Sequence, residues 1–141
     1  MSFQEKSAWV MLVALSCSVI FYVVSLFNLT INSGALPSPS APALLGLAIV
    51  TVVIAIAGHI IAAVLNPKEA NAPADERERL IVQKAGHLSS HVLAVGVVLA
   101  LLSFLLIQDG QILFYGCFAS LVLSHLAEYA LHIVFNRRSL N

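Results

Sequence analysis

Four long apolar stretches, each free of Lys and Arg in its apolar body, constrain this chain more than any other feature. They run from about 7 to 29, 43 to 65, 86 to 107 and 111 to 135. A helix needs roughly 20 mostly apolar residues to cross a membrane, and each stretch reaches that length. The apolar residues run continuously instead of alternating, which disfavours lipid-facing barrel strands. We therefore expect an all-α integral membrane protein, a four-helix transmembrane bundle.

The composition supports this class and excludes others. Apolar residues make up 60% of the 141 residues and charged residues only 10%, whereas a soluble domain carries about 25% charge. Seven Lys and Arg balance seven Asp and Glu, so no basic patch favours nucleic acid as a partner. The length fits a single transmembrane domain, 1–141. The first stretch is longer than the apolar part of a signal peptide, so we interpret it as a retained anchor.

The connections between the stretches predict the orientation. Segment 32–42 is uncharged and 108–110 holds one acid. The basic residues all flank the opposite membrane face: Lys6, Lys68, Arg77, Arg79, Lys84, Arg137 and Arg138. The positive-inside rule then places both termini and the central loop in the cytoplasm.

The third helix is expected to begin well before its apolar stretch, 86–107. Asp75 has the position of an N-cap, with Glu78 three residues later. The expected helices are therefore about 7–29, 43–65, 75–107 and 111–136.

Five histidines lie in or near the predicted spans, and all fall in the cytoplasmic half: His59, His87, His91, His125 and His132. A rise of 1.5 Å per residue places them in a slab roughly 10–15 Å thick. At about 100° per residue, His87 and His91 share one helix face, and so do His125, Glu128 and His132. Three helices thus bring imidazole to one level of the bilayer, and Tyr129 borders the face on the last helix.

This pattern predicts a cofactor site, because imidazole binds Zn, Cu and Fe and is an axial ligand of haem. We expect a haem b or a transition-metal ion (Zn, Fe or Cu) between the second, third and fourth helices. The expected ligands are His91, His125 and His59 first, then His87, His132 and Glu128. If the group is haem, the residues expected to receive its propionates are Arg77, Arg79, Lys84, Arg137 and Arg138.

Two other interpretations of the histidines remain open at this point. They can form structural hydrogen bonds between helices, with Ser89, Ser90 and Ser124 as partners. They can also handle protons without a metal, since ionisable groups inside a membrane are functional candidates.

At the level of function, the leading hypothesis is a cofactor-binding membrane protein that serves electron transfer or the handling of metal or haem. The alternatives are a non-catalytic accessory subunit of a larger respiratory or photosynthetic complex and a proton or ion transporter. No self-sufficient catalytic motif is present, which favours a protein that is not an enzyme. The expected partners are the lipid bilayer and either a second copy or a larger membrane complex.

A resemblance to a known family rests on the C-terminal half. The run Asp75-Glu76-Arg77-Glu78-Arg79, the segment Ala127-Glu128-Tyr129-Ala130 and the final Arg137-Arg138 resemble a bacterial family of small four-helix membrane proteins of unknown function. The resemblance implies a multi-pass protein of the bacterial cytoplasmic (inner) membrane and implies no activity. The histidines at 87, 91, 125 and 132 look like departures from the family pattern, which suggests that they are a specialisation of this chain.

Overall fold

Four helices account for nearly all of the described chain. The computed structural model describes residues 3–65, 67 and 75–138. Its helices are α1 (Phe3–Ser33), α2 (Ala41–Leu65), α4 (Glu76–Ile107) and α5 (Gly110–Arg138). The all-α expectation with four helices is confirmed, and each helix is long and apolar enough to cross a membrane. Three of the four extend beyond the predicted bounds, because the polar flanks of the apolar stretches continue the backbone hydrogen bonding.

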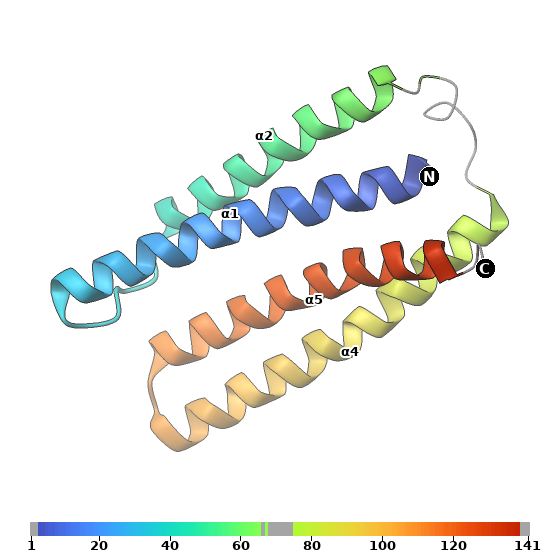
Figure 1. The fold of residues 1–141 in the computed structure, drawn as a ribbon. Helices are drawn as coiled ribbons and strands as arrows, with labels where there is room; N and C mark the ends of the chain where they lie inside the picture. Colours follow the sequence, from blue (N-terminus) through green and yellow to red (C-terminus); the bar gives the residue numbers. More distant parts are fainter. Residues whose placement is uncertain (1–2, 66, 68–74, 139–141) are drawn as a thin grey trace.

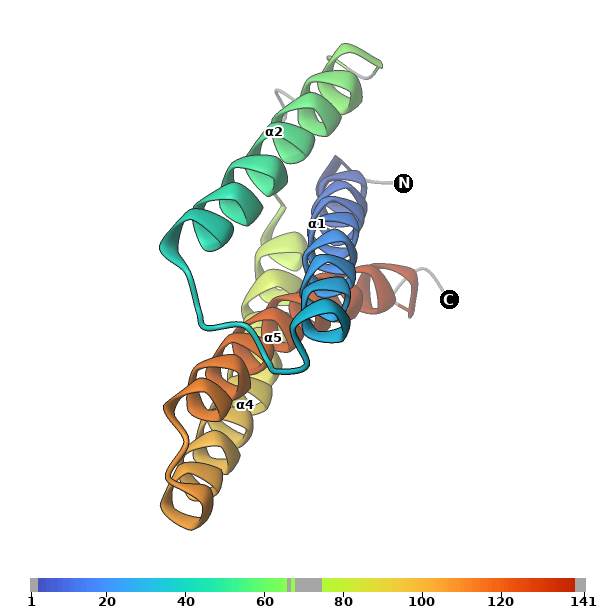
Figure 2. The same cartoon turned by 90° about the vertical axis from the view of Figure 1, so that its left-hand side faces the viewer.

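The helices are arranged as an open bundle (Figures 1 and 2). α4 and α5 form the most extensive pair, α1 packs on α5, and α2 packs mainly on α1. The start of α1, the end of α2, the start of α4 and the end of α5 lie at one end of the bundle. We call it the terminal end. The α1–α2 and α4–α5 connections lie at the opposite end. These two nearly uncharged connections are thus at the other end of the bundle from the basic residues, as the sequence predicts.

Small residues form the contacts between helices. A Cβ added at Gly96 of α4 would meet Ser120 of α5, and one at Gly116 would lie 2.9 Å from the Cβ of Ala100. On the other side, a Cβ at Gly58 of α2 would lie 2.5 Å from a methyl of Val10. Close backbone approach of this kind is typical of helix pairs in membranes.

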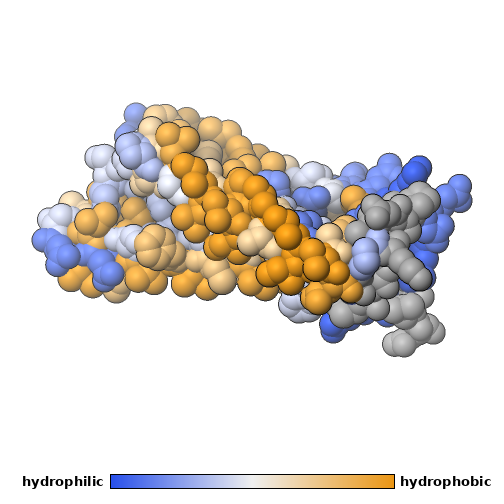
Figure 3. All heavy atoms as spheres, turned by 90° about the horizontal axis from the view of Figure 1, so that it is seen from above, coloured by the Kyte–Doolittle hydropathy of each residue, from blue (hydrophilic) through white to orange (hydrophobic). Residues whose placement is uncertain are grey.

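Large apolar side chains point outward instead of inward (Figure 3). Phe21 is 70% exposed and Leu106 85% exposed, while many of the most buried residues are Ala and Ser. An apolar belt runs along the middle of the molecule, and hydrophilic residues gather at the two ends. A surface of this kind is suited to lipid, because large contiguous apolar patches are rare on soluble monomers.

Hydrogen bonds cap α4 at its start and stabilise the turn that joins α4 to α5. Asp75 caps α4 by accepting from the Glu76 backbone N–H, which confirms the predicted N-cap. Gln108 ends the helix in the left-handed conformation, with φ of 59°. The Asp109 carboxylate then accepts from the backbone N–H of Gln111 at 2.7 Å. These bonds satisfy backbone groups that helix ends leave without partners.

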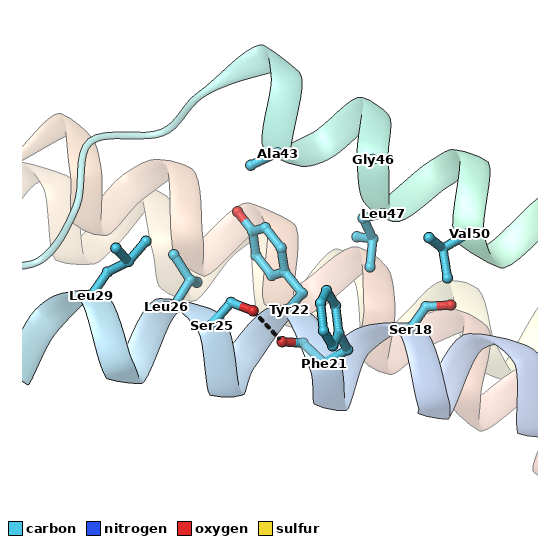
Figure 4. A pocket seen from close by; sticks show the side chains of 10 residues that line it. All are labelled: Ser18, Phe21, Tyr22, Ser25, Leu26, Leu29, Ala43, Gly46, Leu47 and Val50. Atoms are coloured by element: carbon cyan, nitrogen blue, oxygen red, sulfur yellow. Dashed lines mark hydrogen bonds between the residues drawn. The ribbon is translucent and has the colours of Figure 1, made fainter.

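An apolar cavity of about 290 Å³ lies between α1 and α2, away from the terminal end (Figure 4). The Ser18 and Ser25 hydroxyls on its wall donate back to the carbonyls of Ala14 and Phe21 in their own helix. The wall is therefore almost wholly apolar, and it suits a hydrocarbon chain better than a polar ligand.

Candidate metal site

A small cavity lined by both polar and apolar side chains lies between α1, α4 and α5 near the terminal end. Its volume is about 150 Å³. We call it the terminal cavity, and it is lined by Gln4, Ser7, Ala8, Met11, Val82, Ala85, Glu128, Tyr129 and His132. It thus joins two sequence-predicted ligands, His132 and Glu128, to polar groups of α1.

His132 is the most buried of the five histidines. Its side chain lines the terminal cavity, and the residue is only 8% exposed. Its Nε2 atom is buried and has no hydrogen-bond partner among the described residues. Burying a polar atom without a partner costs about 1–3 kcal/mol, so an atom of this kind is accounted for by a bound water or ion.

Glu128 lies one turn from His132 along α5 and lines the same cavity. One of its oxygens is 3.5 Å from Nδ1 of His125. The other faces α4 where that helix has Gly86, since a Cβ added there would lie 3.7 Å from it. The carboxylate therefore lies between the cavity and His125.

His59 forms a contact between helices. Its Nδ1 lies 2.7 Å from the carbonyl of Ala55, which can only accept, so Nδ1 is the donor. Nε2 then accepts from the Ser7 hydroxyl of α1 at 2.8 Å. This is the structural hydrogen bond between helices that sequence analysis left open, although its partner is a serine of the first helix.

His87 and His91 lie on the exposed side of α4. The Ser89 carbonyl accepts from the Ser124 hydroxyl of α5 at 2.9 Å, so this turn of α4 packs on α5. His91 lies about 160° from Ser89 around the helix and is exposed. Its Nδ1 donates to the His87 carbonyl at 2.8 Å, and the two rings meet edge to face with centroids 4.9 Å apart.

The described residues contain no group of three or more His, Cys, Asp or Glu that could hold a metal ion. The structure therefore does not bring His59, His91 and His125 together. Sequence spacing predicts which histidines of one helix share a face, as His87 and His91 do on α4. It did not fix the rotation of one helix against another, and α4 turns its two imidazoles away from α5.

The five basic residues expected at haem propionates have separate surroundings. Arg77, Lys84 and Arg138 line one groove between α4 and α5. Arg137 pairs with the buried Glu5 at 3.3 Å and lies over the ring of Trp9. Arg79 is exposed and does not line this groove.

Sequence reasoning missed the polar residues of α1. Gln4 and Ser7 line the terminal cavity, and Glu5 beside them is only 2% exposed. A signal was present, because Gln4 and Ser7 are three positions apart and so share one helix face. The first helix carries no histidine, so the residue type that marks the predicted site is missing from it.

Comparison with known proteins adds no relative: no family model, no curated protein and no solved structure matches this chain.

Proposed function

We propose that this chain is a multi-pass membrane protein that holds a transition-metal ion in the terminal cavity, with both termini on the cytoplasmic side. The orientation rests on charge. The basic residues of the described chain all lie in the first turns of α1, in the first turns of α4 or in the last turn of α5. The positive-inside rule places such an end in the cytoplasm, and the family resemblance suggests a bacterial cytoplasmic membrane.

One observation carries the metal proposal: Nε2 of His132 is buried without a hydrogen-bond partner among the described residues, and His132 lines a cavity that Glu128 also lines. Imidazole nitrogen together with carboxylate oxygen is a donor set for Zn, Fe and similar ions. A cation there would satisfy Nε2 and offset the charge of Glu128. Gln4, Ser7 and Tyr129 line the same cavity, and their side-chain oxygens would supply further weak ligands.

The cavity size favours an ion over haem at this position. The volume of about 150 Å³ is half the lower end of the range for small-molecule pockets, about 300 Å³. Zn, Fe and Cu remain open as the identity of the ion, since all accept imidazole.

The small number of strong protein ligands indicates a role in metal handling. Structural zinc sites are closed by four protein ligands, whereas the described residues that line the terminal cavity include only two strong ligands, His132 and Glu128. Water completes the shell of such an ion, which then exchanges readily. Exchange suits a protein that receives and passes on a metal.

A titration on the purified, chelator-free protein in detergent tests this proposal. Zn²⁺ binding would be measured by calorimetry for the wild type, His132→Gln, Glu128→Gln and the matched control His91→Gln. We expect binding to weaken by at least tenfold in the first two variants and to be unchanged in the control. Circular dichroism checks that each variant stays helical. Equal binding by His132→Gln and the wild type would overturn the proposal, as would loss in His91→Gln alone.

A second candidate function, an accessory subunit of a larger membrane complex, is favoured by the exposed imidazoles of His87 and His91. From the turn at Gln108, His91 lies about 25 Å along α4, inside the roughly 30 Å apolar core. An exposed polar ring at that depth is better covered by protein than by lipid. A stoichiometric partner that co-purifies in mild detergent and is lost in His91→Leu would support this function, and a single species in native mass spectrometry would contradict it.

A further inference from the structure

A groove with three basic side chains separates the first turns of α4 from the last turns of α5. Its volume is about 380 Å³. We call it the basic groove, and it is lined by Arg77, Leu80, Ile81, Lys84, Phe135 and Arg138. It is separate from the terminal cavity, because the two share no lining residue.

The charges converge from two helices. Arg77 and Lys84 are seven positions apart, so they lie within about 20° of each other around α4. Arg138 faces them from the last turn of α5. The Lys84 ammonium lies over the Phe135 ring, 5.3 Å from its centroid, which holds that charge against the groove. No acidic residue in the described part of the chain lines the space, although Glu76 and Glu78 lie in the same first turn of α4.

The lining combines positive charge with apolar side chains. Leu80 is 65% exposed, and Ile81 and Phe135 add further apolar surface. A ligand that matches both parts has an anionic group joined to a hydrocarbon chain. An inorganic anion would use only the basic residues.

The depth of the groove agrees with such a ligand. From the turn at Gln108, Lys84 lies about 36 Å along α4 and Arg77 about 46 Å. An apolar core of roughly 30 Å ends before Lys84, so these side chains lie at or just beyond the headgroups. Arg138 ends α5 at the same end of the bundle.

We propose that the basic groove binds an anionic glycerophospholipid of the leaflet on the terminal side. Its phosphate is held by Arg77, Lys84 and Arg138, Leu80 and Ile81 lie beside the headgroup, and its chain leaves the groove past Phe135 toward the membrane core. Guanidinium groups bind phosphate oxygens in pairs, and basic pockets between transmembrane helices on the cytoplasmic side recognise such headgroups. No histidine lines the groove, so its basic residues do not face an imidazole that would hold haem iron.

Native mass spectrometry with defined lipids tests this inference. The wild type, Arg77→Gln, Lys84→Gln and Arg79→Gln would each be incubated with phosphatidylglycerol or with phosphatidylcholine. Arg79→Gln is the matched control, because it removes one charge from the same turns of α4 without touching the groove. We expect the wild type to retain phosphatidylglycerol at least fivefold more than phosphatidylcholine. Arg77→Gln and Lys84→Gln should each lower that preference severalfold, and Arg79→Gln should not.

Three results would overturn the inference. Equal retention of both lipids would show that the groove does not select a negatively charged headgroup. An equal loss in Arg79→Gln would show only a diffuse attraction between charges. Displacement of phosphatidylglycerol by millimolar inorganic phosphate would assign the groove to a free anion instead of a lipid. Zn²⁺ binding by Arg77→Gln and Lys84→Gln should match the wild type, which separates this inference from the metal proposal.

Discussion

The hydroxyl of Ser7 donates to Nε2 of His59 at 2.8 Å, and this bond ties α1 to α2 near the terminal end. The other nitrogen of the same ring is fixed by the carbonyl of Ala55. α2 has only one buried residue, Ala62. A polar bond therefore matters more for the position of α2 than it would for a helix with many neighbours.

We predict that Ser7 and His59 are energetically coupled. A double-mutant cycle with Ser7→Ala and His59→Ala should give a coupling of about 0.6 kcal/mol, and at most about 1.7, as for hydrogen bonds between helices in membranes. The measurement is unfolding by SDS in mixed micelles. His91→Ala combined with Ser7→Ala is the control cycle, where we expect no coupling. Additive effects of Ser7→Ala and His59→Ala would show that the bond does not hold α2 in place.

Substitution of Gly96, which lies where α4 contacts α5, should weaken the packing of these two helices. Gly96→Ala places a methyl against Ser120, whose backbone Cα is also only 3.3 Å away, so rotation of the serine side chain cannot fully relieve the clash. We expect a loss of about 1–3 kcal/mol, measured by SDS unfolding. Gly46→Ala in α2 is the control, because its added Cβ meets nothing within 4 Å. Gly46→Ala should be neutral or stabilising, and equal losses in both variants would contradict this packing.

The Glu5–Arg137 pair should stabilise the contact between the start of α1 and the end of α5. The Glu5 side chain is 3% exposed and that of Arg137 is 61% exposed, so water screens the pair from one side. Because Arg137→Gln removes the charge partner shown for the buried Glu5 carboxylate, we expect it to cost about 1–3 kcal/mol, with part of the loss coming from the contact with Trp9. The neighbouring change Arg138→Gln should alter the free energy of unfolding by less than about 0.5 kcal/mol. The reverse order of the two losses would argue against the pair.

The orientation predicts which positions react with membrane-impermeant thiol reagents. In a Cys17→Ala, Cys117→Ala background, Ala35→Cys in the α1–α2 connection should be labelled from outside intact cells. Glu76→Cys at the start of α4 should be labelled only after lysis. Both positions are exposed, so accessibility depends on the side of the membrane alone. The opposite labelling pattern would invert the proposed orientation.

The sequence predicted the helices well because each apolar stretch carries its own signal. Length and apolar content identified four helices, and Asp75 marked the start of α4 before its apolar body begins. The true bounds run further, as at Phe3 in α1, because membrane thickness limits the apolar part and not the helix itself.

The candidate site was predicted only in part. The pairing of Glu128 with His132 along α5 followed from helical spacing, and both residues line the terminal cavity. Whether His91 lies close to His125 depends on how α4 is rotated about its own axis relative to α5. That rotation is set by Gly96, Ala100 and Gly116, the residues that allow the backbones to approach. Small residues carry little periodic signal in a sequence this apolar, so the outward position of His91 was not foreseen.

The most direct test of the central claim is a metal analysis of protein purified without chelators, with an absorption spectrum of the same sample before and after reduction. We predict close to one transition-metal ion per chain and no Soret band, and a severalfold lower metal content in His132→Gln than in His91→Gln. A Soret band that is present in the wild type and absent in His91→Gln would contradict the account, because it would assign haem to the exposed face of α4. A metal content unchanged by His132→Gln would show that the buried imidazole holds no ion.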